Sequence, residues 1–259
     1  MTSSIDKTKP PRYVIFDLDE TLGYFTELSI VWGCLQSVYK AKGQYTFNKL
    51  CEVFENDYFR PGIFKVFRFL KKQGDAVRVI LYTNNTGSME WLRLILNFIE
   101  MKAGVNNLFY KIVPGYKPGQ KSGACRRTSF DKTYPEIVRC ASIPADAKVI
   151  FFDDLWHSQM NAKEVTYVHV KAYYRPMRPS HIIHKLQNSY FSFLDYGTNS
   201  YLYKCIRNFH RQYGSQYMHK SARVSDKDIL TPLRDFLGVQ KKTVRHRKNG
   251  LNKTKKNKH

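Results

Sequence analysis

The sequence predicts an α/β fold in which a parallel sheet is flanked by helices. Three short apolar runs, at 12–17, 76–82 and 148–152, contain almost no polar break. Such runs are typical of strands that are buried on both faces of a parallel sheet. Each run ends in carboxylates or hydroxyls, at the edge of the sheet where ligands bind in this class of fold.

The first predicted strand leads into the most informative motif of the chain. Asp17 and Asp19 directly follow Tyr13–Phe16, and Thr21 comes two residues later. Repulsion between two neighbouring carboxylates is relieved when a divalent cation lies between them. A carboxylate held in this way can also attack phosphorus and form an aspartyl-phosphate. A buried strand followed by an acidic turn is the alternative interpretation.

Residues 22–59 separate this motif from the next recognisable element. Apolar residues at helical spacing predict one helix near 27–41, and a second apolar set over 47–54 indicates another. The two helices are either a small insert near the site or ordinary core helices. The segment Arg60–Leu70 then predicts a further helix, since Pro61 is tolerated at a helix start.

The second predicted strand ends in the polar run Thr83-Asn84-Asn85. A hydroxyl at the tip of a strand can bind a phosphoryl oxygen, and the N–H groups of the helix that follows add to this. The alternative is that Asn84, Asn85 or Ser88 simply caps that helix. The helix itself is predicted over 88–101 from its amphipathic pattern.

A short strand is predicted over 108–114, and the loop at 115–123 that follows lacks the order of a Walker-type phosphate loop. A site for phosphoryl groups needs a cation. Lys132, just before a predicted helix over 134–140, is the first candidate. Three other basic residues follow in order of preference, namely Arg127, Lys121 and Arg126.

The third predicted strand ends in Asp153-Asp154, which repeats the pattern of the first motif. These acids are expected to bind the same cation as the first pair. An acidic turn is again the alternative, although three strand ends that bear D-x-D-x-T, T and D-D in this order are difficult to obtain by chance. A further strand is predicted over 166–170.

Together these motifs resemble the haloacid-dehalogenase (HAD) superfamily. The form Asp-Leu-Asp-Glu-Thr-Leu at 17–22 is similar to the FCP/NLI-interacting-factor-like phosphatases, which act on the phosphorylated tail of RNA polymerase II and related substrates. The R-P-G segment at 60–62 is also similar, whereas Asn84 and Asn85 depart from the T-A or T-x-S often found there. The resemblance covers roughly 12–172, and proteins of this pattern also occur in large DNA viruses.

The resemblance implies a HAD-like (Rossmann-like) fold and a phosphatase that hydrolyses phosphomonoesters. Asp17 would attack phosphorus. Asp19 would protonate the leaving oxygen and then activate water, a role that requires a raised pKa. Thr83 and Lys132 would hold the phosphoryl oxygens.

The cofactor that the resemblance implies is Mg²⁺. Its ligands would be Asp17, the backbone carbonyl of Asp19, and Asp153, with Asp154 in support. The residues expected to bind substrate are Thr21, Asn84 and Arg127.

The expected substrate is phosphoserine or phosphothreonine on a protein, such as a peptide like the tail of RNA polymerase II. One alternative is a phosphatase of nucleic-acid ends or nucleotides, which shares the same motifs. The other is a catalytically silent module that binds nucleic acid or protein on the same fold.

The charge of the chain favours anionic partners. Its formal net charge is +22, with 43 Lys+Arg against 21 Asp+Glu. Residues 173–238 are predicted to be a helical basic extension, in which tyrosines and cations either contact nucleic acid or form an ordinary core and surface. Residues 1–11 are expected to be a disordered lead-in. Residues 239–259 are expected to be a disordered basic tail that acts as a nuclear signal or nucleic-acid patch.

The five cysteines are odd in number and form no C-x-x-C pair. They predict small apolar thiols in a reducing compartment, the nucleus or cytoplasm. No apolar run approaches the roughly 20 residues that span a bilayer, so no membrane partner is expected. The sequence makes no prediction of the oligomeric state.

Overall fold

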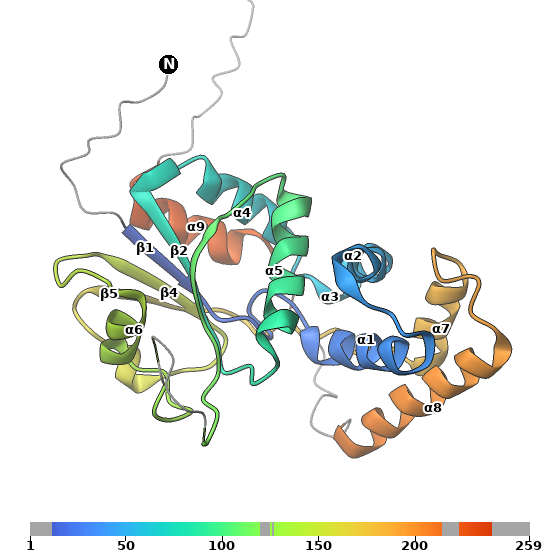
Figure 1. Ribbon diagram of the computed structural model, residues 1–259. Coiled ribbons are helices and arrows are strands. Elements are labelled where there is room, and N and C mark those ends of the chain that lie inside the picture. The colour runs from blue at the N-terminus through green and yellow to red at the C-terminus, as the bar shows by residue number, and fades with distance from the viewer. Residues whose placement is uncertain (1–11, 120–124, 126, 214–222, 240–259) are drawn as a thin grey trace, which may run out of the picture.

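The computed structural model describes residues 12–119, 125, 127–213 and 223–239. Within these residues, five parallel strands form one sheet in the order β3-β2-β1-β4-β5 (Figure 1). The strands are β1 (Arg12–Phe16), β2 (Val77–Tyr82), β3 (Phe109–Val113), β4 (Val149–Asp153) and β5 (Val165–His169). The predicted lead-in at 1–11, nearly all of the predicted tail, and the candidates Lys121 and Arg126 lie outside the described residues.

The central strand β1 sets the position of the strand ends. Phe16 is in register with Leu81 of β2 and with Phe152 of β4. The residues that follow these positions therefore emerge at one edge of the sheet. The predicted parallel sheet flanked by helices is confirmed.

Helices cover both faces of the sheet because each central strand is apolar on both sides. On one face, alternate strand residues such as Val14 and Phe16 pack with apolar residues of α4 (Ile63–Lys71), α5 (Met89–Ala103) and α9 (Lys227–Leu237). On the other face, Tyr13 and Ile15 pack with α6 (Tyr134–Ala141). Figure 1 shows α4 and α9 together above the sheet and α6 below it.

A group of helices beside the sheet forms what we call the helical lobe. It consists of α1 (Phe25–Tyr39), α2 (Gly43–Val53), α3 (Glu55–Tyr58), α7 (Pro179–Gln187) and α8 (Tyr196–Tyr213). Figure 1 shows these helices gathered to the right of the sheet, and α8 contacts both α1 and α7. Two segments that are far apart in the chain thus build one body.

The buried carboxylate of Glu27 connects the two segments of the lobe. It accepts a hydrogen bond of 2.8 Å from the Tyr58 hydroxyl and one of 3.1 Å from the backbone N–H of Met177. His210 of α8 lies 2.5 Å from the same carboxylate through its Nε2. The hydrophobic core runs from the sheet through α1 into α7 and α8, so residue 172 does not divide two separate cores.

Helix α9 returns from the lobe to the sheet. Its residues Ile229, Leu230 and Leu233 are buried in the same core as the strands. The Arg12 guanidinium donates a 2.7 Å hydrogen bond to the backbone carbonyl of Phe236. The last part of the described chain therefore covers a face of the central strands.

The cysteines require a correction of the sequence prediction. The structure joins Cys34 to Cys205 and Cys125 to Cys140 as disulfides, and Cys51 is a buried free thiol. The prediction of small apolar thiols is therefore wrong for four of the five. Cys34 and Cys205 meet only because α1 packs on α8, which the spacing of cysteines does not reveal. The compartment stays a prediction.

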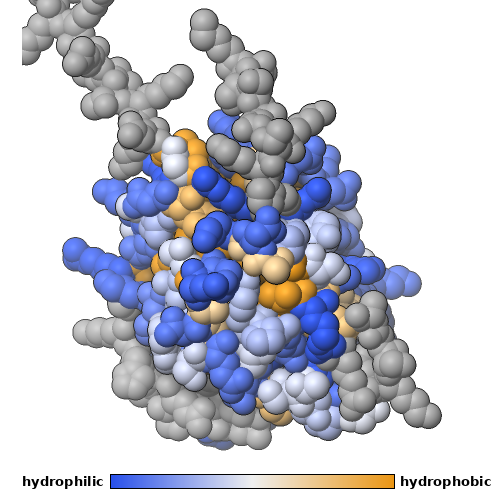
Figure 2. All heavy atoms as spheres, turned by 90° about the vertical axis from the view of Figure 1, so that its left-hand side faces the viewer, coloured by the Kyte–Doolittle hydropathy of each residue, from blue (hydrophilic) through white to orange (hydrophobic). Residues whose placement is uncertain are grey.

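The outer surface on the side of the sheet away from the lobe is mostly hydrophilic, with hydrophobic side chains scattered between charged ones (Figure 2). Within the described residues, no helix combines the length and the apolar character needed to cross a bilayer.

Candidate active site

Carboxylates from two neighbouring strands meet at the carboxyl edge of the sheet. Asp17 directly follows β1, and its backbone N–H donates a 2.9 Å hydrogen bond to the carbonyl of Phe152. Asp153 is the last residue of β4, and Asp154 follows it. One oxygen from each of Asp17, Asp153 and Asp154 lies within 4.8 Å of the others. Oxygen ligands at this spacing suit a hard divalent cation such as Mg²⁺.

Lys132 is the buried cation of this cluster. Its Nζ donates hydrogen bonds of 2.5 Å to Asp17 Oδ1 and 2.6 Å to Asp153 Oδ2. The ammonium also lies within 6 Å of the ring centroids of Tyr82 and Phe151. Its position just before α6 therefore places a positive charge between the ends of β1 and β4.

Thr21 returns to the cluster through a tight turn after β1. Glu20 adopts a left-handed backbone conformation, with φ of 57°. The Thr21 hydroxyl then donates a 3.0 Å hydrogen bond to Asp154 Oδ1 and accepts one of 3.1 Å from the Asp154 N–H. Thr21, which the sequence places among the substrate-binding residues, thus orients a carboxylate in this structure.

Asp19 lies beside the cluster and bonds to a residue of the second motif. Its Oδ2 accepts a 2.7 Å hydrogen bond from Asn85 Nδ2, while its Oδ1 is buried without a hydrogen-bond partner. Burial first, and repulsion from Asp17 second, raise the pKa of Asp19 to about 7. A carboxyl group with this pKa holds a proton for part of the time near neutral pH, as a general acid must.

Thr83 and Asn84 occupy the tip of β2 in the same place. Thr83 is fully buried, and its hydroxyl accepts a 3.0 Å hydrogen bond from the Asn85 N–H. Thr83, Asn84 and Asn85 line a small cavity of about 260 Å³ together with Asp17, Asp19 and Lys132. The structure therefore brings the ends of all three motifs around one cavity.

Arg127 lies behind this cavity and does not line it. Its Nε donates a 2.9 Å hydrogen bond to Glu136, and its Nη1 donates to the Thr83 carbonyl at 2.9 Å and to Asn84 Oδ1 at 2.7 Å. Its Nη2 donates to the backbone carbonyls of 130 and 131. All five N–H groups of the guanidinium are bonded to protein atoms. Arg127 would have to leave them to reach a substrate.

The crowding of acids changes their proton affinities. Burial first, and repulsion from Asp17 and Asp153 second, raise the pKa of Asp154 to about 6. Burial and repulsion from Asp19 raise the pKa of Glu20 to about 9. Burial also acts to raise the pKa of Asp153, but the His157 imidazole 3.5 Å away and the hydrogen-bonded Lys132 ammonium lower it overall. Such a cluster has a strong electrostatic preference for a cation.

Sequence reasoning did not assign Asn85 and Glu20 to the site. Asn85 was interpreted only as a helix cap or a departure from the family pattern. Its place just after β2, at the edge of the sheet where ligands bind, could have indicated a site residue. Glu20 lies inside the first motif. Thr26 of α1 also lines the cavity, and nothing in the sequence pattern marks it.

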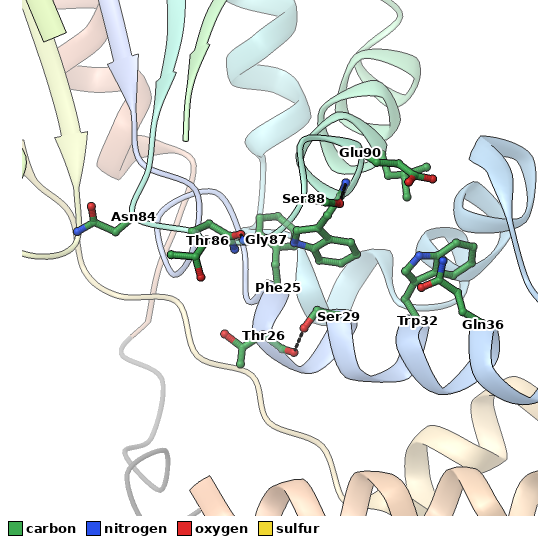
Figure 3. Close-up of a pocket in the computed structure, with 13 residues that line it drawn as sticks. Phe25, Thr26, Ser29, Trp32, Gln36, Asn84, Thr86, Gly87, Ser88 and Glu90 are labelled. Carbon is green, nitrogen blue, oxygen red and sulfur yellow. Dashed lines mark hydrogen bonds between the residues drawn. The ribbon is translucent and has the colours of Figure 1, made fainter. Parts of the chain in front are cut away.

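A larger groove of about 520 Å³ adjoins the cavity and shares Thr26, Asn84 and Asn85 with it. Figure 3 shows Phe25, Ser29 and Trp32 projecting from α1 on one side, with Ser88 and Glu90 at the start of α5 on the other. Helix α1 therefore forms a wall beside the acid cluster. The segment 22–59 contributes to the site as well as to the core.

No protein-family model matches the chain, and no curated protein sequence matches it significantly. Among solved structures, the chain is similar to a protein from Thermotoga maritima assigned as a beta-phosphoglucomutase. The TM-score is 0.29 at 14% identity, and the match covers 61% of this chain and 95% of that chain. A TM-score this low does not establish a shared fold, and the function proposed below rests on the site itself.

Proposed function

We propose that the protein is a Mg²⁺-dependent phosphatase that hydrolyses phosphomonoesters through an aspartyl-phosphate on Asp17. The observation that supports this most is the convergence of Asp17, Asp153 and Asp154 on one buried point. The order of the three motifs, with D-x-D-x-T, T and D-D at successive strand ends, resembles HAD phosphatases and agrees with this chemistry.

Asp17 would attack phosphorus through a carboxylate oxygen, and the bond from phosphorus to the ester oxygen would break. Asp19 would transfer its proton to that leaving oxygen, which departs as an alcohol. The Asp19 carboxylate would then accept a proton from a water molecule that attacks the aspartyl-phosphate, releasing phosphate and restoring both acids. The hydrogen bond from Asn85 to Asp19 Oδ2 leaves Oδ1 free for these transfers.

Asp17, Asp153 and Asp154 would hold Mg²⁺, which supplies positive charge that offsets the negative charge of the phosphoryl group. Lys132 would supply the second positive charge, since its ammonium lies between Asp17 and Asp153. The Thr83 hydroxyl at the end of β2 would donate to a phosphoryl oxygen.

The groove beside the cavity favours a phosphopeptide over a phosphorylated nucleic acid. Its lining contains aromatic, amide and hydroxyl groups and one acid, Glu90, but no lysine or arginine among the described residues. Beside the groove the Lys117 ammonium donates a 3.1 Å hydrogen bond to the Gly87 carbonyl. The several backbone phosphates of a nucleic acid would thus meet few cations, whereas a neutral or cationic peptide segment would meet little repulsion. Phosphoserine or phosphothreonine in a protein, such as a peptide like the tail of RNA polymerase II, is therefore our proposed substrate.

The nucleophile is tested by Asp17→Asn. We expect turnover of a generic aryl phosphate to fall by at least about 10³-fold, because an amide does not form the acyl-phosphate. The substitution is nearly isosteric, so the circular-dichroism spectrum should be unchanged. Asp146→Asn, in an exposed turn before β4, is the matched control and should retain full activity. Turnover at the wild-type rate in Asp17→Asn would refute the assignment.

The substrate class is tested by a panel of a phosphoserine peptide, a 3′-phosphorylated oligonucleotide, a nucleotide and an aryl phosphate, each with Mg²⁺ and with a chelator. We expect the peptide to have the highest kcat/KM and all activity to need Mg²⁺. A preference for the oligonucleotide would replace the proposed substrate and keep the chemistry. Inactivity on the whole panel would favour the silent binding module.

A further inference from the structure

An exposed cluster of four aromatic rings lies at the end of the helical lobe. Tyr39 ends α1, Tyr45 lies in α2, and Tyr190 and Phe193 lie between α7 and α8. Their exposed fractions are 41%, 65%, 44% and 50%. Large aromatic side chains on a protein surface are normally scattered singly. A group of them that comes from distant parts of the chain therefore indicates a binding surface.

The four rings form a continuous series of contacts, tilted between Tyr39 and Phe193 and edge-to-face in the other two pairs. The ring centroids of Tyr39 and Phe193 are 4.8 Å apart, those of Phe193 and Tyr190 are 6.0 Å apart, and those of Tyr190 and Tyr45 are 6.1 Å apart. The buried ring of Phe191 lies beneath, 5.2 Å from Tyr190. We call these four exposed rings the aromatic platform. Their mutual contacts hold them in place before any ligand arrives.

Lysines lie beside the rings that α1 and α2 contribute to the platform. Lys40 and Lys42 are exposed next to Tyr39 in the chain, and Lys49 Nζ lies 5.7 Å from the centroid of the Tyr45 ring. The segment 39–49 contains no acidic residue. The acids nearest in sequence are Asp195 and Glu52, and Glu52 is paired with Lys49 at 2.9 Å. With Lys49 and Glu52 offsetting each other, Lys40 and Lys42 give the segment 39–49 its excess of positive charge.

The platform is separate from the acid cluster. Helix α1 begins with Phe25 beside the groove and ends at Tyr39. At about 1.5 Å per residue, the two ends of this helix are roughly 20 Å apart. A ligand on the platform would therefore lie outside the cavity that holds Asp17 and Lys132.

We propose that the aromatic platform binds single-stranded nucleic acid, with bases stacked on the rings and lysines facing the phosphates. Unpaired bases stack on exposed aromatic rings without regard to sequence, and cations beside the rings track the backbone. The net charge of +22 also favours a polyanion. A second copy of the chain is a poorer occupant, because a symmetric contact would bring the same lysines of the two copies together.

The test uses the full chain and fluorescence anisotropy with a labelled, unphosphorylated single-stranded oligonucleotide at two salt concentrations. The combined variant Tyr45→Ala, Tyr190→Ala and Phe193→Ala should bind at least about tenfold more weakly at both salt concentrations. Tyr110→Ala is the matched control, because Tyr110 is an equally exposed ring with the Arg78 guanidinium 5.1 Å from its centroid, on β3. The control should bind like the wild type.

Charge and stacking are separated by the salt dependence. Loss of Lys40 and Lys42 should reduce the slope of affinity against salt, whereas loss of the rings should lower affinity and keep the slope. A duplex of the same sequence should bind more weakly than the single strand, because its bases are already stacked.

Three results would overturn the proposal. One is wild-type affinity in the triple variant with its fold intact by circular dichroism, which would place binding elsewhere in the chain. Another is equal affinity for duplex and single strand. The third is a wild-type dimer that becomes monomeric in the triple variant, which would make the platform a protein interface. Aryl phosphatase activity of each variant is measured in parallel. The binding result can then be interpreted separately from the proposed hydrolysis.

Discussion

Lys132 and Arg127 are both buried and only a few residues apart, but they make different contacts. Lys132 bonds to two carboxylates that face the cavity. Arg127 bonds to Glu136 and to carbonyls that shape the tip of β2. We infer that Lys132 supplies positive charge to the reaction and that Arg127 holds Thr83 and Asn84 in position.

Replacement of Arg127 should destabilise the protein. Arg127→Met leaves Glu136 buried without its cation, and we expect a loss of about 3 kcal/mol in the free energy of unfolding, measured by urea denaturation. Arg127→Lys should recover little of it, because one ammonium cannot replace a planar fork of donors. Arg93→Met, on an exposed part of α5, should change stability by less than about 0.5 kcal/mol. Equal effects at Arg93 and Arg127 would contradict this role.

At the residue scale, the sequence indicated which side chains lie together at the edge of the sheet better than it indicated their contacts. Strand ends are visible as polar residues after apolar runs, which is why Asp17, Thr83 and Asp153 were found. The hydrogen bonds from Arg127 to backbone carbonyls could not be predicted, because every residue has a backbone carbonyl and the sequence does not mark which one is used. Asn85 was missed since an asparagine before a helix is more often a cap.

At the element scale, two glycines at either side of the start of α1 differ in the space around them. A Cβ added to Gly23 would lie 2.3 Å from the carbonyl oxygen of Tyr58, whereas one added to Gly33 within α1 would meet nothing within 4 Å. The close approach at Gly23 lets the turn after the first motif pack against the end of α3, where the Tyr24 N–H bonds to the same carbonyl at 2.7 Å.

Alanine at these two positions should therefore have opposite effects. Gly23→Ala should lower the free energy of unfolding by about 2 kcal/mol, because backbone atoms must move. Gly33→Ala should raise it by about 0.5–1 kcal/mol, since glycine in a helix interior loses more entropy on folding than alanine. Urea denaturation of both variants tests the pair, and a stabilising Gly23→Ala would show that the turn is looser than the contacts indicate.

The sequence predicted individual elements closely and their assembly poorly. The strand expected over 76–82 is β2 at Val77–Tyr82, and the helix expected over 88–101 is α5 at Met89–Ala103, because hydrophobic periodicity is a local signal. The packing of α1 on α8 and the return of α9 to the sheet join segments that are far apart in the chain. Such contacts depend on side-chain shape, which a single sequence does not display.

At the scale of the whole molecule, the candidate site belongs to two bodies. The edge of the sheet supplies Asp17 and Asp153, the loop before α6 supplies Lys132, and the helical lobe supplies the groove wall through α1. Helix α9 supports the sheet from one face. Residues in the last part of the described chain therefore support the position of acids near its beginning.

Two truncations should distinguish the stability that α9 gives to the sheet from any contribution of the basic residues that follow it. Removal of 223–259 deletes α9 and exposes the partners of Ile229, Leu230 and Leu233, which should cost at least about 4 kcal/mol and lower the melting temperature sharply. Removal of 240–259 alone should leave the melting temperature nearly unchanged. Thermal melts of both proteins distinguish these outcomes, and equal stability of the two would mean that α9 contributes little.

The pairing of α1 with α8 has a consequence for biosynthesis. The two helices are also joined by Cys34 and Cys205, which are 171 positions apart. On the ribosome, α1 emerges long before α8, so its apolar face stays open to water or to chaperones while most of the nascent chain is still being made. The helix that forms the wall of the groove is thus packed on its partner only after nearly all of the described residues have left the exit tunnel.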